Sequence, residues 1–149
     1  MALTSNRFQT ERYDIQSLAL GAPGAGLERM WAVPANRVLQ LVAVSCALTT
    51  AVAVADRSLF VGMETAGTRC AISGSGRVQV ASAGPVGYHF ATGVAFADLT
   101  AAGVDSVFAP LMEDMFVRTG NSIVISVTNI QGADVLDSIV IRYKEWVQD

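Results

Sequence analysis

The sequence contains few charged residues. Only 15% of its 149 residues are Asp, Glu, Lys or Arg, against roughly 25% in a typical soluble domain. Thirteen acidic and ten basic side chains give a net charge of -3, the opposite of the balance that nucleic-acid-binding domains normally show. Apolar residues make up 52% of the chain, which excludes intrinsic disorder. So little polar material cannot coat a lone monomer, and we expect surface to be buried against a protein partner, with no nucleic acid bound.

Histidine and cysteine are scarce. The single histidine, His89, lies between two aromatic residues, and we interpret it as a structural or surface group because a zinc site needs three or four donors at matched spacing. The two cysteines, Cys46 and Cys70, occupy apolar segments and form no C-x-x-C pair. They are predicted to be reduced core thiols. A disulfide between adjacent strands is the alternative that the sequence leaves open.

Catalytic motifs are also lacking. No serine stands in a G-x-S-x-G elbow, and the glycine-rich residues 21–26 have neither the lysine nor the hydroxyl residue of a phosphate loop. The carboxylates of Glu113 and Asp114, or of Asp134 and Asp137, could share a proton or a calcium ion, but turn capping and a solvated loop explain them better. The sequence therefore predicts a protein that is not an enzyme and that carries no metal and no cofactor.

The chain shows neither a secretory signal nor a convincing membrane segment. Residues 1–14 carry charges and no apolar stretch, so we expect synthesis in a cytoplasm. Residues 38–55 are uncharged over a length that approaches a membrane helix. Polar residues interrupt this run, however, and its Val and Thr residues favour a sheet. We predict two buried strands, divided at Thr49 and Thr50, and no membrane insertion.

A period of two, which is typical of β-strands, is the main pattern that the sequence contains. Apolar residues alternate with small or polar ones over residues 59–63, 123–128 and 139–144, and a turn is expected at residues 65–67. Gly74 and Gly76 interrupt a further alternation, which predicts a bulged or bent strand.

Helical signals are sparse by comparison. Residues 97–115 could form a short helix or a loop, but Gly103 and Pro110 interrupt them, so we expect one helical turn at most. Strands at intervals of about ten to fifteen residues fit a two-sheet sandwich, and eight strands in this length fit a jelly roll. The predicted fold class is all-β, an antiparallel β-sandwich of the jelly-roll type over residues 35–149.

The first part of the chain differs from the rest. Residues 1–34 combine glycines and prolines with isolated large side chains and charges in no steady period, and we interpret them as an extended N-terminal arm. The arm could fold over its own sandwich as an irregular first strand, or it could dock on a neighbouring subunit. Large residues of the arm and one near the end of the chain form the candidate interface: Phe8, Tyr13, Met30, Trp31 and Trp146.

Five fragments of the sequence, in the same order, resemble a group of small tailed-phage virion proteins. These fragments are an opening V-P-A before a strand, a threonine-rich turn that leads to an arginine and a hydrophobic strand, a segment with Y-x-F-A-x-G, a G-x-x-I, and a closing N-I-Q-x-x-D. The corresponding residues here are 33–35, 49–63 with Arg57, 81–93 with Tyr88 and Phe90, 120–123, and 129–134. The resemblance covers residues 33–146, and it departs from the group after Asp134, where Val135 and Leu136 replace more polar residues.

The resemblance implies a function for the chain. Members of the group are β-sandwich decoration or cement proteins that bind the outer surface of an assembled phage capsid and stabilise the head. It implies the major capsid protein as partner, a location on the virion after synthesis in the bacterial host, and repeated copies. We expect a homotrimer first and a dimer second. The alternative is a β-sandwich that binds a receptor or glycan on the phage surface, because one fold can host both roles.

Overall fold

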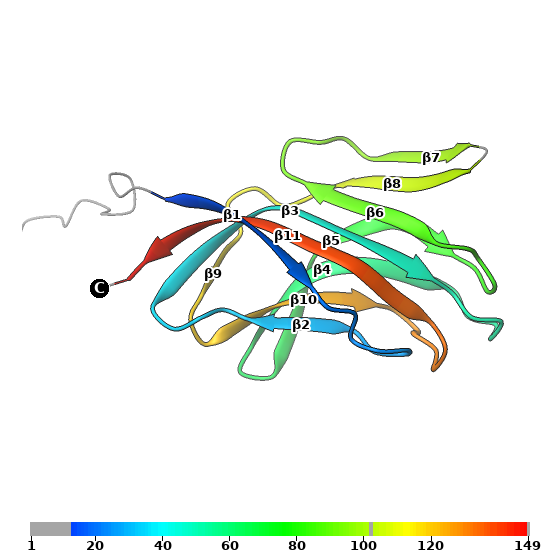
Figure 1. Ribbon diagram of the computed structural model, residues 1–149, viewed down its shortest axis with the longest axis horizontal. Helices are drawn as coiled ribbons and strands as arrows, with labels where there is room; N and C mark the ends of the chain where they lie inside the picture. Colours follow the sequence, from blue (N-terminus) through cyan, green and yellow to red (C-terminus); the bar gives the residue numbers. More distant parts are fainter. Residues whose placement is uncertain (1–12, 102, 149) are drawn as a thin grey trace, which may run out of the picture.

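The computed structural model describes residues 13–101 and 103–148, which form two β-sheets packed against each other (Figure 1). One sheet has the order β1-β11-β3-β6-β8-β7, with β9 beside β3, and the other has the order β2-β10-β4-β5. The β-sandwich that the sequence predicted is confirmed. Its strands are β1 (Asp14–Leu20), β2 (Arg29–Ala32), β3 (Arg37–Thr49), β4 (Arg57–Thr65), β5 (Thr68–Gln79), β6 (Val86–Ala91), β7 (Ala97–Ala101), β8 (Val104–Pro110), β9 (Phe116–Arg118), β10 (Asn121–Val127) and β11 (Val135–Val147).

The hydrophobic core lies between the two sheets. Alternate residues of the central strands point inward, so the period of two in the sequence becomes the core-facing side of each sheet. Full burial of one such Leu or Ile side chain stabilises the fold by about 1.5–3 kcal/mol. The largest apolar side chains that are essentially inaccessible are Tyr88, Phe90, Leu39, Leu41, Leu48, Leu59, Ile123, Ile125, Leu136, Ile139 and Ile141.

The two longest strands, β3 and β11, pair along almost their whole length. The predicted alternation in β11 is confirmed, because Ile141 and Tyr143 are buried whereas Arg142 is exposed. Two register shifts interrupt the pairing, and Ser138 at the first of them has a φ of 51°. The bent strand predicted around Gly74 and Gly76 is also confirmed, since β5 pairs with β4 through two register shifts.

The uncharged run at residues 38–55 forms one strand, not two. Residues 38–49 belong to β3, but residues 51–55 form a loop. The prediction of a second buried strand is therefore wrong. The backbone groups of Ala51, Ala53 and Ala55 bind the side chains of Arg57 and Asp134 instead of a neighbouring strand. Among the described residues, no helix is long and apolar enough to cross a membrane.

The interpretation of residues 97–115 as a short helix or a loop is also wrong. This segment contains β7 and β8, which pair antiparallel, and β8 also pairs parallel to β6. Gly103, which we interpreted as a helix breaker, lies between the two strands with a φ of 82°, a conformation that suits glycine in a tight turn. Pro110 is the last residue of β8.

The described part of the N-terminal arm belongs to the sandwich. β1 pairs with β11 at one edge of the larger sheet, and β2 pairs with β10 at one edge of the smaller sheet. The arm thus supplies one strand to each sheet from residue 14 to residue 32. Phe8 lies outside the described residues.

The two cysteines are free and lie in different sheets. Cys46 on β3 is buried, as predicted, and burial raises the pKa of its thiol to about 12. Cys70 on β5 is exposed. The prediction of a core thiol is wrong for Cys70, which lies on β5, one of the two edge strands of its sheet.

Candidate functional site

Three aromatic side chains form a cluster on the outer face of the larger sheet. The ring centroid of Trp146 lies 5.5 Å from that of Tyr13 and 5.8 Å from that of Phe116. Tyr143 faces the core, so alternation along β11 places Lys144 and Trp146 on the opposite side of the sheet. Trp146 is only 6% exposed, whereas Tyr13 and Phe116 are each 46% exposed. The cluster therefore consists of a buried indole with two exposed rings beside it.

The buried indole has an unsatisfied hydrogen-bond donor. The Nε1–H of Trp146 is inaccessible and has no acceptor among the described residues. Leaving such a donor unpaired costs about 1–3 kcal/mol. The unpaired N–H of Trp146 therefore lowers the stability of the fold relative to a packing that supplies an acceptor.

Basic side chains surround the aromatic cluster without carboxylate partners. Lys144 lies 4.7 Å above the Tyr13 ring centroid in a cation–π contact. Arg142 on β11 and Arg118 on β9 are exposed on the same face, since their neighbours Ile141 and Val117 point into the core. Within residues 13–101 and 103–148, none of these three cations forms an ion pair, whereas four other arginines do.

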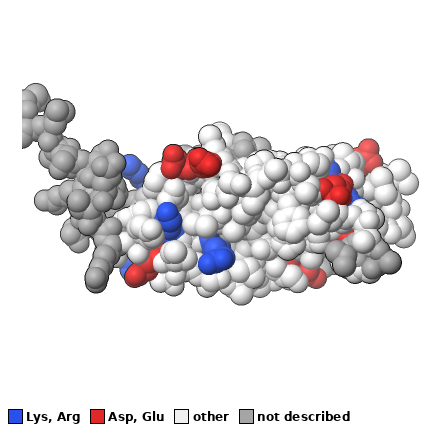
Figure 2. Space-filling view, turned by 90° about the horizontal axis from the view of Figure 1, so that it is seen from above, with Lys and Arg blue, Asp and Glu red and all other residues white. Residues whose placement is uncertain are grey.

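Acidic side chains lie on the other side of β3. An open hollow of about 250 Å³ is lined by Gln40, Thr92, Gly93, Glu113 and Asp114. Gln40 pairs with Lys144 on one side and with Phe116 on the other, and its amide donates a 3.3 Å hydrogen bond to Asp114. β3 therefore separates Arg142 and Lys144 from Glu113 and Asp114, whereas Arg118 on β9 lies on the same side of β3 as the carboxylates. The face seen in Figure 2 is largely uncharged, with a few scattered basic and acidic groups.

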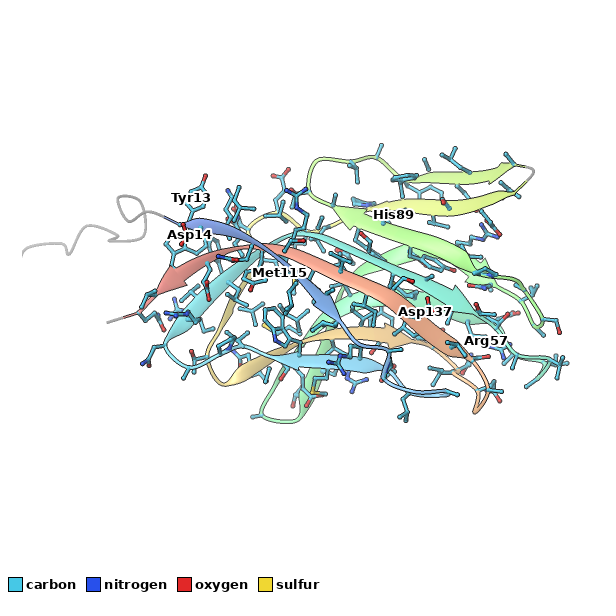
Figure 3. The ribbon with its side chains drawn as sticks, viewed as in Figure 1. Tyr13, Asp14, Arg57, His89, Met115 and Asp137 are labelled. Carbon is cyan, nitrogen blue, oxygen red and sulfur yellow. The ribbon has the colours of Figure 1, made fainter. Side chains whose placement is uncertain are left out.

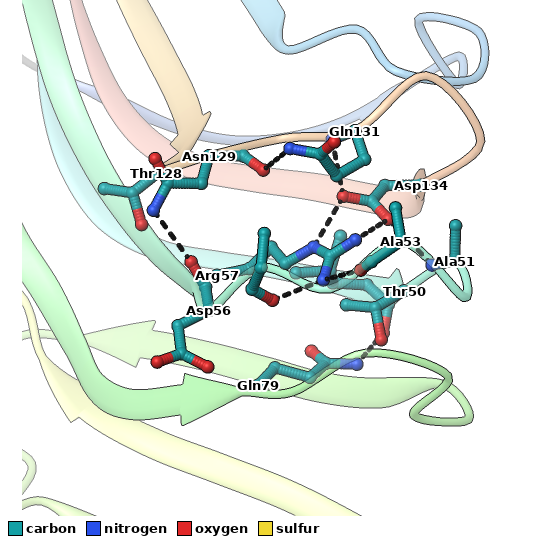
Figure 4. A network of polar contacts seen from close by, with 12 residues as sticks. Thr50, Ala51, Ala53, Asp56, Arg57, Gln79, Thr128, Asn129, Gln131 and Asp134 are labelled. Carbon is teal, nitrogen blue, oxygen red and sulfur yellow. Dashed lines mark hydrogen bonds and ion pairs between the residues drawn. The ribbon is translucent and has the colours of Figure 1, made fainter.

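A buried ion pair joins the two sheets at the opposite end of the sandwich (Figure 4). The Arg57 guanidinium donates two 2.9 Å hydrogen bonds to the Asp134 carboxylate, and both side chains are completely buried. Burial alone would raise the pKa of Asp134, but the hydrogen bonds from Arg57 and from the backbone of Ala51 and Gln131 hold that pKa below its usual value. Asp134 does cap its turn, through the N–H of Gln131 at 2.8 Å. The expectation of a solvated loop is wrong for Asp134.

The same ion pair fixes the loop that follows β3. The guanidinium of Arg57 donates to the carbonyl groups of Ala53, at 2.9 Å, and Ala55, while the N–H of Ala51 donates to Asp134 at 2.7 Å. The intervening residues then face the solvent, and Val52 and Val54 are 82% and 97% exposed. Val80, also exposed, accepts a 2.6 Å hydrogen bond from Thr50 through its carbonyl. We call Val52, Val54 and Val80 the valine tip.

The structure separates the candidate interface residues. It brings Tyr13 and Trp146 together, but Trp31 packs against the core with its ring 5.2 Å from that of Tyr143. Met30 is exposed on the other sheet.

Sequence reasoning missed two parts of the site. Phe116 directly follows the segment 97–115 and no strand was predicted there, although its alternation with the buried Val117 was a usable signal. Arg57 and Asp134 were both noted as positions of the resemblance, yet nothing in the sequence joined them as a pair. His89 stacks on Phe108 at 4.9 Å, which agrees with a structural or surface role.

Residues 13–101 and 103–148 contain no group of three or more side chains that could hold a metal ion. No family model, curated protein or solved structure matches the chain.

Proposed function

We propose that the protein is a structural virion protein that binds the outer surface of a phage capsid as a decoration or cement protein and stabilises the head. The observation that carries this proposal is the valine tip. An uncharged loop there holds two valines almost fully in solvent, and its backbone is fixed by the buried Arg57–Asp134 pair. Apolar groups held rigidly in solvent suit a docking contact, because little conformational freedom is lost on binding.

The ordered resemblance to tailed-phage virion proteins supports the same proposal. Arg57 and Asp134 are positions in two of the five fragments that carry the resemblance, and in this chain they bind each other. The fragments thus include the pair that fixes the tip. On this proposal the partner is the major capsid protein, the protein lies on the capsid surface, and the sandwich topology belongs to the jelly-roll type.

The alternative function, binding of a receptor or glycan, has one observation in its favour. Tyr13 and Phe116 expose aromatic rings near the polar side chain of Gln40, and sugar-binding surfaces combine such groups. Trp31 cannot contribute to this surface, since it packs against the core, and Trp146 is buried. The aromatic area offered to a sugar is therefore small, and we place this function second.

Binding to heads that lack the protein tests the proposal. We expect the chain to co-sediment with such heads, to saturate at a stoichiometry set by lattice symmetry, and to raise the temperature at which the heads release DNA. The double variant Val52→Ser/Val54→Ser should bind at least about tenfold more weakly, because two apolar contacts are lost. Val147→Ser, at the other end of the sandwich, is the matched control for an exposed valine. Heads that bind neither form of the protein would overturn the proposal.

A further inference from the structure

The outer face of the larger sheet carries charges of both signs in an ordered arrangement. We call this surface the mixed face: the basic residues Arg118, Arg142 and Lys144, the acidic residues Glu113 and Asp114, and the aromatic rings of Tyr13 and Phe116. Arg142 and Lys144 lie on β11, on one side of β3, and the acidic pair lies beyond Gln40 on the other side. No ion pair joins the two groups within a single copy, as far as the described residues show.

Such an arrangement is self-complementary under one particular rotation. Two copies whose mixed faces meet can be related by a two-fold axis that runs parallel to β3 and lies between the two faces. Rotation about this axis places the β11 side of β3 in one copy opposite the β9 side of β3 in the other. Arg142 of one copy, level with Ala43, then faces the loop of Glu113 and Asp114 of the other, with Lys144 next to it. The same rotation carries Arg118, which pairs with Val38 on one side of β3, over Trp146, which pairs with Val38 on the other.

The apolar groups of the face fit the same rotation. Phe116 and Lys144 flank Gln40 on opposite sides, so Phe116 of one copy meets Lys144 of the other, in a position suited to a cation–π contact. Tyr13 and Ile15, both exposed at the basic side, are covered by the opposite side of the second copy. Covering these rings removes apolar surface from water.

We propose that the mixed face binds a second copy of this chain in an isologous, two-fold pair. In a two-fold interface both partners use the same patch of surface, so the patch must contain charged groups and also the opposite charges that these groups meet. The unpaired cations and the nearby carboxylates meet that requirement on one surface. This pairing is independent of the proposed binding to a capsid, and it favours a dimer over the trimer that the resemblance placed first.

Charge reversal tests the pairing. Sedimentation equilibrium of the full chain should give twice 15.7 kDa. Arg142→Glu/Lys144→Glu should be monomeric, and so should Glu113→Lys/Asp114→Lys, because each places like charges opposite each other. We expect the dissociation constant to rise about 100-fold in each variant. An equimolar mixture of the two variants should recover the dimer, because each supplies the charge that the other lacks.

The control for charge alone is Asp56→Lys, at an exposed carboxylate near the valine tip, which should leave the dimer intact. A monomeric or trimeric wild-type protein would overturn the proposal. So would a dimer that survives both reversals, or a mixture of the two variants that stays monomeric. Binding of the chain to heads can still be measured after each of these outcomes. Failure of the proposed pairing is therefore distinguishable from failure of the proposed capsid binding.

A cross-link gives a second test that needs no change of charge. Gln40 lies on β3 at the position of the proposed axis, so the residues at position 40 of the two copies face each other. Gln40→Cys in a Cys70→Ser background should form a disulfide-linked dimer under mild oxidation. Met30→Cys in the same background, on the other sheet, should remain largely monomeric. Equal cross-linking of both variants, or none at position 40, would overturn the proposed geometry.

Discussion

Arg57 and Asp134 place two opposite charges at completely buried positions, far apart in the sequence. Removing one partner of such a pair leaves the other charge buried without compensation, at a cost of about 3–5 kcal/mol. Asp134→Ala should therefore lower the free energy of unfolding by roughly this amount, measured by chemical denaturation. Asp137→Ala, a half-buried carboxylate of β11 without an ion pair among the described residues, should change it by less than about 1 kcal/mol. Equal effects of the two substitutions would contradict the assigned role.

The pH dependence of the same pair has a definite sign. Because the pKa of Asp134 is lower in the folded protein than its ordinary value of 3.8, its ionised form stabilises the fold above that value. This contribution is lost as the pH falls through the lowered pKa. The difference in free energy of unfolding between the wild type and Asp134→Asn should thus be constant near neutral pH and shrink below about pH 3.8. A difference that stays unchanged down to pH 2 would contradict this mechanism.

At the scale of elements, β5 crosses close to the segment that leads into β7. Gly76 has a φ of 71°, and a Cβ atom there would lie 2.8 Å from the ring of Phe96. Gly76→Ala combines a strained backbone with a steric clash, and we expect it to lower the free energy of unfolding by about 1–3 kcal/mol. Gly74 on the same strand has open space around it and no positive φ. Gly74→Ala is therefore the matched control, and similar losses for both variants would contradict the role of the Phe96 contact.

The elements also show where sequence patterns were sufficient. β4, β10 and β11 were predicted because large apolar residues that face the core recur at every second position, although β10 is buried on both faces over residues 123–127. β7 and β8 were missed because a glycine such as Gly103 is as compatible with the end of a helix as with the turn of a hairpin. The loop at residues 51–55 was missed because Val and Ala alternate there as they would in a strand. Its backbone partners, Arg57 and Asp134, are identified only by the three-dimensional structure.

The candidate site was only partly predictable for a related reason. Tyr13 and Trp146 stood out as large residues in an unusual setting, but their contact depends on the pairing of β1 with β11. The complementary charges of the mixed face come from β9, β11 and the loop before β9. These charges share one surface only because β11 and β9 pair with β3 in the observed register.

At the scale of the whole molecule, the mixed face and the valine tip lie at opposite ends of the sandwich. Figure 3 shows Tyr13 at one end and Arg57 at the other. β3 connects the two regions, and its 13 residues span about 40 Å at a rise of about 3.3 Å per residue. A second copy on the mixed face therefore leaves the tip free. Because the proposed two-fold axis is parallel to β3, both tips of a pair point in the same direction.

This geometry makes the pair bivalent towards a shell that offers repeated sites. The second tip binds at a high effective concentration once the first is bound, which can raise the apparent affinity about 100-fold without any new contact. The monomeric variant Arg142→Glu/Lys144→Glu keeps its tip unchanged, so it should bind heads about 100-fold more weakly and dissociate faster than the wild type. Its mixture with Glu113→Lys/Asp114→Lys should recover tight binding, as measured by co-sedimentation at low protein concentration. Equally tight binding by the monomeric variant would show that each tip acts alone.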